Sequence, residues 1–122
     1  MKKKGCIFKI KTWDILEGTV LSLLLNSPSH GYSLIEQISE FGISPELLTQ
    51  GVIYRILRSL ETKGFISSGW ETEGTGAARR VYKITPAGKK YLEQFINIEK
   101  KKIEHLNEVF KRIEFILNNS ES

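Results

Sequence analysis

The segment TQGVIYRILRSLETKGF, residues 49–65, carries the pattern that decides the fold. Thr49 is a favourable N-cap and Gly64 a typical C-terminal stop, so a helix is predicted from about Gln50 to Lys63. On a helical wheel, the apolar residues form one stripe, and small or polar residues form the opposite face. The stripe consists of Ile53, Ile56, Leu57 and Leu60, and the opposite face of Gly51, Arg55, Arg58 and Thr62. We therefore expect this helix to be buried on one side and basic on the other.

The residues that follow this helix change to the alternation typical of strands. Residues 65–73 alternate with a period of two, and residues 79–84 form a second segment of the same type. The glycine-rich residues 74–78 between them are turn formers. The sequence therefore predicts a small β-hairpin with basic side chains near its tip.

A long helix is predicted after the hairpin. Thr85 is a favourable N-cap, Pro86 suits the first helical position, and no helix breaker follows Gly88 before about Asn118. Its apolar residues recur at alternating spacings of four and three, as in a coiled-coil seam, and Glu99 is the only polar member. At roughly 50 Å, the helix is too long for one small domain to cover. We expect Leu92, Ile96, Ile103, Leu106, Phe110, Ile113 and Leu117 to form a dimerisation seam.

Two further helices are predicted on the N-terminal side of the chain. The first spans residues 13–26 and is apolar on most of its circumference, so more than one element must cover it. The second spans residues 31–41 after a turn-forming stretch in which Ser29 is a candidate N-cap. A short helical turn is expected at residues 44–47.

The composition bounds the class of protein. The chain has 122 residues, of which 40% are hydrophobic and 26% charged, which suits one domain with an appended helix. A single cysteine, Cys6, excludes an intramolecular disulfide framework and suits a reducing compartment. We see no secretion signal and no apolar run long enough to span a bilayer, so we expect a cytoplasmic protein without membrane contact.

The net charge of +4 is unevenly distributed. Residues 1–12 contain five lysines and no acidic residue, and residues 49–90 contain eight basic and three acidic residues. Residues 13–48, in contrast, contain five acidic residues and no Lys or Arg. Positive charge on particular segments is what a nucleic-acid interface requires, although the lysines of residues 1–12 also fit a disordered, solvated arm.

Five short motifs in order resemble those of the PadR-like family of bacterial transcriptional regulators, over about residues 14–92. They are Gly18-Thr19-Val20-Leu21, Ser29-His30-Gly31-Tyr32, Gly51-Val52-Ile53-Tyr54, Leu57-x-x-Leu60-Glu61-x-x-Gly64-Phe65-Ile66 and Arg79-Arg80-Val81-Tyr82-x-Ile84-Thr85-x-x-Gly88. The chain departs from the family where Arg55 and Ala78 replace prolines and Val81 replaces a tyrosine. We interpret Arg55 as an added DNA contact, and the other two changes leave the pose of the wing open.

The resemblance implies a mainly α fold with a small β-hairpin, in which a winged helix-turn-helix precedes a long C-terminal dimerisation helix. It divides the chain into a basic N-terminal arm (1–12), a DNA-binding domain (13–85), a dimerisation helix (86–118) and a disordered tail (119–122). It also implies a homodimer that binds a two-fold site on double-stranded DNA, as a repressor.

The helix over residues 50–63 would then enter the major groove with its N-terminal end toward the bases. Arginine forks bind guanine edges or phosphates, tyrosine hydroxyls bind phosphates, and wing arginines reach the flanking minor groove or its phosphates. Surface salt bridges, for example between Arg58 and Glu61, and simple ring packing are the alternatives. The predicted DNA-binding residues are Tyr32, Thr49, Gln50, Tyr54, Arg55, Arg58, Arg79 and Arg80.

The resemblance also implies a small aromatic or cationic effector near the dimer centre. Trp13, Phe95 and Phe110 are available to stack on such a molecule, but packing of these rings in the interface is the favoured alternative. His30 is interpreted as a loop-packing or capping residue.

Two other classes of function remain to be weighed. We expect no enzyme, metal or cofactor, because the chain has two histidines, one cysteine and no nucleophile motif or phosphate loop. A winged helix that binds another protein is the main rival, since the fold serves both purposes, but such a module needs no basic outward face. A non-specific or double-stranded-RNA binder is a third alternative.

Overall fold

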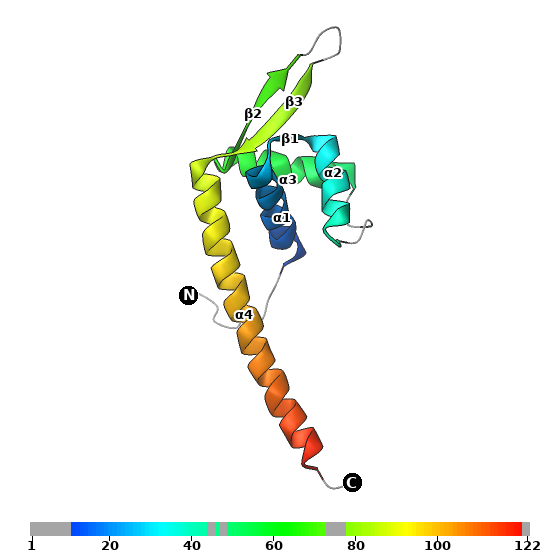
Figure 1. Cartoon of the computed structure of the whole chain (residues 1–122), viewed down its shortest axis with the longest axis vertical. Helices are drawn as coiled ribbons and strands as arrows, with labels where there is room; N and C mark the ends of the chain where they lie inside the picture. The colour runs from blue at the N-terminus through cyan, green and yellow to red at the C-terminus, as the bar shows by residue number, and fades with distance from the viewer. Residues whose placement is uncertain (1–10, 44–45, 47–48, 73–77, 121–122) are drawn as a thin grey trace.

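The computed structural model describes residues 11–43, 46, 49–72 and 78–120. Three helices and a small sheet form a head, and α4 runs along this head before its C-terminal part extends well beyond it (Figure 1). The fold class predicted from the sequence, mainly α with a small β element, is confirmed. The elements in order are α1 (Thr12–Asn26), β1 (Ser29–His30), α2 (Gly31–Glu40), α3 (Gln50–Thr62), β2 (Ile66–Glu71), β3 (Arg79–Ile84) and α4 (Pro86–Asn118).

The core of the head is made by the apolar faces of α1, α2 and α3. Leu21, Leu34 and Ile53 have no exposed surface, and each such side chain contributes about 1.5–3 kcal/mol on burial. As expected from its apolar circumference, α1 contacts several elements, namely α2, α3, α4 and β3. The predicted stripe of α3, consisting of Ile53, Ile56, Leu57 and Leu60, is fully buried.

The sheet has one strand more than the sequence predicted. The order is β1-β3-β2, with both pairs antiparallel, and the two-residue β1 pairs Ser29 with Tyr82. Ser29 therefore does not cap α2 as expected. The N-cap is His30, which makes no side-chain cap bond, and the Ser29 hydroxyl instead accepts a hydrogen bond from Gln37 Nε2 at 3.3 Å.

The ends of α3 and α4 lie where the capping residues predicted them. Thr49 Oγ1 accepts from Val52 N at 3.2 Å, and Thr85 Oγ1 accepts from Gly88 N at 3.1 Å. The chain leaves α3 through Gly64, whose φ of +81° favours glycine. The predicted helical turn at residues 44–47 lies outside the described residues, apart from Glu46.

The apolar seam of α4 is largely uncovered in a single chain, as its length predicted. Leu92 and Leu106 are half-buried, whereas the exposed fractions of the other five residues lie between 48% and 69%. Those five are Ile96, Ile103, Phe110, Ile113 and Leu117. Among the helices in the described residues, none has both the length and the apolar character that a membrane span requires.

Candidate nucleic-acid interface

The outward face of α3 carries two exposed arginines, Arg55 and Arg58, one helical turn apart. Within the described part of the chain, neither guanidinium forms a hydrogen bond or an ion pair with a carboxylate. Arg58 in particular does not pair with Glu61, because Glu61 faces the hairpin and accepts from Ser68 Oγ at 2.7 Å. Both arginine forks are therefore available to a ligand in front of α3.

The N-terminal end of the same helix is also exposed. Thr49 and Gln50 lie at the surface, and a Cβ added at Gly51 would meet no atom within 4 Å. The Thr49 hydroxyl oxygen is used as the cap acceptor, so its hydrogen remains available as a donor. An open helix end with free backbone N–H groups favours a negatively charged partner.

The two arginines of β3 are held by different neighbours. Arg79 Nη1 donates to the Tyr32 hydroxyl at 2.9 Å, which places this guanidinium beside the start of α2. Arg80 Nε donates to Ser68 Oγ at 3.0 Å, and its guanidinium lies over the Trp70 ring, 5.4 Å from the centroid. Both side chains remain exposed. They are therefore oriented by the protein and still accessible to a ligand.

A small pocket of about 160 Å³ lies where α2, α3 and the sheet meet. Gly31 at the start of α2 forms part of it, and a Cβ there would clash with the Tyr54 ring at 2.7 Å. Burial raises the pKa of Tyr82 in this pocket, against the opposing effect of the Arg80 charge, so its hydroxyl stays protonated. The lining residues are His30, Gly31, Tyr32, Tyr54, Arg79, Arg80 and Tyr82. Hydroxyl and guanidinium donors around a helix start suit a phosphate oxygen.

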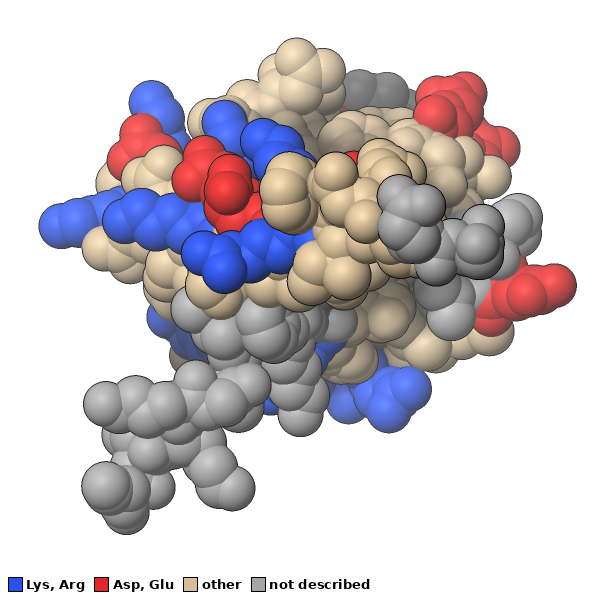
Figure 2. Space-filling model, turned by 90° about the horizontal axis from the view of Figure 1, so that it is seen from below, with Lys and Arg blue, Asp and Glu red and all other residues tan. Residues whose placement is uncertain are grey.

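The far end of α4 carries charge of a different kind. Seen from that end, blue Lys and Arg side chains are interspersed with red Asp and Glu side chains (Figure 2). Near that end, Lys111 Nζ lies 3.7 Å from Glu108 Oε2 and both side chains are exposed, whereas the pair of Lys102 and Glu99 in the middle of α4, with 3.1 Å between Nζ and Oε2, is largely buried. Mixed charge of this kind is typical of a solvated helix face.

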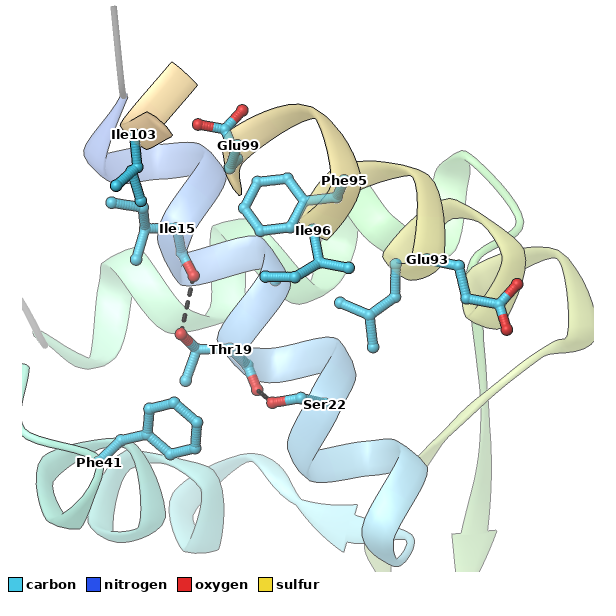
Figure 3. Close-up of a pocket in the computed structure, with 11 residues that line it drawn as sticks. Ile15, Thr19, Ser22, Phe41, Glu93, Phe95, Ile96, Glu99 and Ile103 are labelled. Atoms are coloured by element: carbon cyan, nitrogen blue, oxygen red, sulfur yellow. Dashed lines mark hydrogen bonds between the residues drawn. The ribbon is translucent and has the colours of Figure 1, made fainter. Parts of the chain in front are cut away.

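An apolar groove of about 600 Å³ runs between α1 and α4. Ile15 of α1 and Phe95, Ile96 and Ile103 of α4 face one another across it (Figure 3). The Thr19 and Ser22 hydroxyls at its wall donate to the carbonyl oxygens of Ile15 and Thr19, each at 2.8 Å. The groove therefore presents almost only carbon to a ligand or a partner.

The geometry can now be compared with known proteins. A family model described as "Transcriptional regulator PadR-like family" matches residues 20–94, more than half of the chain. The chain belongs to the PadR-like family. Because this family consists of transcriptional regulators, the expectation that the chain is not an enzyme is also confirmed.

Several solved structures resemble this PadR-like chain. A conserved protein of unknown function, described as a potential transcriptional factor, is 35% identical, with a TM-score of 0.75 over 98% of this chain and 100% of that one. The Bacillus subtilis PadR solved in complex with operator DNA is 27% identical, with a TM-score of 0.60 over 67% of this chain and 46% of that one. An uncharacterized protein from Lysinibacillus sphaericus is 27% identical over 81 residues, which are 66% of this chain and 74% of the relative.

The three aromatic residues predicted to bind an effector do not line one common pocket in this PadR-like chain. Phe95 lines the groove between α1 and α4, whereas Phe110 lies further along α4 and is 55% exposed. Trp13 lines a separate pocket of about 340 Å³ beside Val52 and Arg55 of α3.

Sequence reasoning missed contacts that organise the candidate interface of this PadR-like chain. His30 Nε2 lies 3.2 Å from Glu71 Oε1, and its ring stacks on Tyr32 with centroids 5.4 Å apart. Glu61 holds the Arg80 guanidinium at 3.8 Å. These partners are separated by 41, 2 and 19 positions, and only the His30–Tyr32 spacing lies within reach of a local pattern.

Proposed function

We propose that this PadR-like chain is a sequence-specific transcriptional repressor that binds a two-fold DNA operator as a homodimer. The observation that carries the proposal is the pair Arg55 and Arg58, which are exposed on α3 and form no ion pair with a carboxylate among the described residues. A recognition helix needs such a face, because arginine forks bind guanine O6 and N7 bidentately. A protein-binding winged helix has no comparable need for uncompensated charge.

The wing and the pocket at the start of α2 supply the phosphate contacts. Tyr32 and Tyr54 line this pocket with Arg79 and Arg80, so one phosphate there receives hydroxyl and guanidinium donors together. Such contacts fix the orientation of the protein on the duplex without reading sequence. A similar protein, Bacillus subtilis PadR, is described as bound to operator DNA, which supports the same use of this surface.

The exposed seam of α4 supports the homodimer. Five large apolar side chains of the seam are about half exposed or more, and their contact with water is unfavourable. An identical seam from a second chain would cover them symmetrically. Residues 86–118 then act as the dimerisation helix, and residues 13–85 as the DNA-binding domain. The two recognition helices must lie roughly 34 Å apart to reach successive major-groove faces.

A small aromatic or cationic effector fits the same arrangement. The groove beside Phe95 is apolar, and Glu99 Oε1 near it is buried without a hydrogen-bond partner among the described residues. A cationic group of the effector would give Glu99 Oε1 a hydrogen-bond donor beside the contact of α1 with α4, while Oε2 keeps its pair with Lys102. We expect such a regulator to work in the cytoplasm, together with the DNA.

A mobility-shift assay with the DNA upstream of the chain's own gene, with and without excess competitor DNA, tests this function. A repressor should bind with Kd below about 10⁻⁷ M at physiological salt and resist competitor. Binding that competitor abolishes would indicate a non-specific binder, and no binding at all would favour the protein-interaction module. Light scattering at micromolar concentration should give the mass of two chains.

A further inference from the structure

Among the described residues of the head, one carboxylate is buried and takes no part in the proposed DNA binding. Glu17 on α1 is 1% exposed and lies among the apolar residues of the core. A buried carboxylate is costly unless its oxygens are hydrogen-bonded. Here both oxygens accept, Oε2 from Trp13 Nε1 at 3.1 Å and Lys63 Nζ at 3.2 Å, and Oε1 from the Tyr91 hydroxyl at 3.4 Å.

These donors come from three different helical segments. Trp13 precedes Glu17 by one turn on α1, Lys63 is the C-cap of α3, and Tyr91 lies on the second turn of α4. We call Glu17 and these three donors the Glu17 cluster. The cluster therefore joins the end of the proposed recognition helix to the start of the proposed dimerisation helix.

Further contacts join the residues that follow α3 to the first turns of α4. The rings of Phe65 and Tyr91 stack with centroids 4.4 Å apart, and Thr85 Oγ1 donates to the Gly64 carbonyl at 2.7 Å. Thr85 N also donates to the Phe65 carbonyl at 3.0 Å, and a Cβ at Gly88 would collide with that carbonyl oxygen. The end of α3 is thus tied to the start of α4 at one tightly packed junction, and α1 packs beside it on α4.

A small change of angle at this junction has a large effect at the other end of α3. The 13 residues of α3 span about 20 Å, with Lys63 at the junction and Gln50 at the far end. A tilt of about 10° would move that far end by about 3.4 Å, which is the rise of one base pair. In a dimer, this displacement would change the distance between the two α3 helices and therefore the spacing of the half-sites that they fit.

We propose that Glu17 is a positioning residue, which fixes α3 relative to α4 and so determines the half-site spacing that the dimer accepts. The proposal rests on the proposed function, because it needs the homodimer and the two-fold operator. Glu17 acts through Lys63 and Tyr91 and does not touch DNA. Loss of its charge releases Lys63 while the apolar core of the head remains.

The test compares the wild-type protein with Glu17→Gln on duplexes of different spacing. The operator selected by the full-length wild-type protein from a random pool is remade with one base pair inserted or removed between its half-sites. Wild type should lose about tenfold or more in affinity on each altered duplex. Glu17→Gln should lose less than about threefold, with an unchanged salt dependence.

A second measurement needs no DNA. Nitroxides at Gln50→Cys, in a Cys6→Ser background, report the distance between the two α3 helices of a dimer by pulsed electron resonance. The wild-type distribution should be narrow, and Glu17→Gln should broaden or shift it. Glu108→Gln removes a carboxylate from an exposed pair on α4 and serves as the matched control, which should behave as wild type.

Equal spacing penalties and equal distance distributions for Glu17→Gln and wild type would overturn the inference. Wild-type protein that is monomeric, or indifferent to spacing, would instead contradict the proposed function. If Glu17→Gln does not fold, Tyr91→Phe takes its place in both measurements. That variant keeps the ring stack on Phe65 and removes only one donor from the Glu17 cluster.

Discussion

The outward face of α3 and the seam of α4 are both exposed, but they are exposed in chemically different ways. Arg55 and Arg58 are charged and exposed to water, so the head of the molecule needs no DNA to cover this face. Phe110, Ile113 and Leu117 are apolar and more than half exposed, so the C-terminal part of α4 is incomplete without a partner. The difference teaches that, in the proposed homodimer, the face of α3 would serve DNA binding alone, whereas the seam of α4 would serve both stability and DNA binding.

The largest effect is expected on the seam. Ile103→Asp combined with Phe110→Asp places two carboxylates where another seam should pack, so the protein should become monomeric. Affinity for the two-fold operator should fall at least about a hundredfold, because a monomer contacts only one of the two half-sites. Light scattering and anisotropy titration measure the two effects.

The control for this variant is Lys111→Asp, which changes charge on an exposed, ion-paired position of α4. It should leave the mass at two chains. A double variant that remains dimeric would contradict the role assigned to the seam of α4, because the dimer interface would then lie elsewhere.

The next effect is expected on the face of α3. Arg55→Ala combined with Arg58→Ala should weaken operator binding at least about tenfold. The slope of the logarithm of the binding constant against the logarithm of salt concentration should become shallower by about one to two. The free energy of unfolding should change by less than about 0.5 kcal/mol, because both side chains are exposed. Titrations at several salt concentrations and urea denaturation measure these quantities.

Lys100→Ala combined with Lys101→Ala removes the same charge from exposed positions on α4 and is the matched control. Its salt slope should be that of the wild type. An equal loss of affinity in both double variants would indicate that only overall charge matters, which contradicts a specific role for α3.

A smaller effect is expected in the pocket at the start of α2. Tyr32→Phe removes the hydroxyl that accepts from Arg79 and keeps the ring that stacks on His30. One lost hydrogen bond is worth about 0.5–1.5 kcal/mol, so affinity should fall about twofold to tenfold. The loss should be similar for all operator sequences, since phosphate contacts carry no sequence information. A loss confined to one base substitution would contradict a phosphate contact.

The smallest effect concerns pH. Burial, and then the negative charge of Glu17, raise the pKa of Tyr91 above its ordinary value of 10.0. A raised pKa in the folded state means that its stabilising effect is present below pH 10 and is lost as the pH rises above it. Unfolding free energy should therefore fall at alkaline pH, and Tyr91→Phe should reduce this fall. A denaturation series between pH 8 and 11 measures it, and identical curves would contradict the assignment.

The sequence predicted those features that depend on near neighbours. Thr49 and Gly64 delimit α3 through capping and a positive φ, and Thr85 with Pro86 begins α4, so these boundaries could be read locally. The two-residue strand β1 was missed because two residues show no periodicity. It exists only because β3, some 50 positions later, pairs with it.

The side-chain partners of the interface could not be read in this way. Arg58 and Glu61 have a spacing that permits an ion pair on one helix, and only the folded structure shows Glu61 turned to Ser68 instead. In the sequence, Glu17 is a polar residue in a helix that is apolar on most of its circumference, and nothing near it indicates its distant partners. Its contacts with Lys63 and Tyr91 span 46 and 74 positions, beyond any local pattern.

The extension of α4 beyond the head has a consequence for the amount of protein in a cell. No other described element of the chain accompanies the C-terminal turns of this helix (Figure 1), so in the proposed dimer the other subunit alone would cover their apolar side chains. Mass action would then couple this contact to the abundance of the subunit. Dilution alone would separate the two subunits and release the operator, so the rate of synthesis of the protein would itself control the regulated gene.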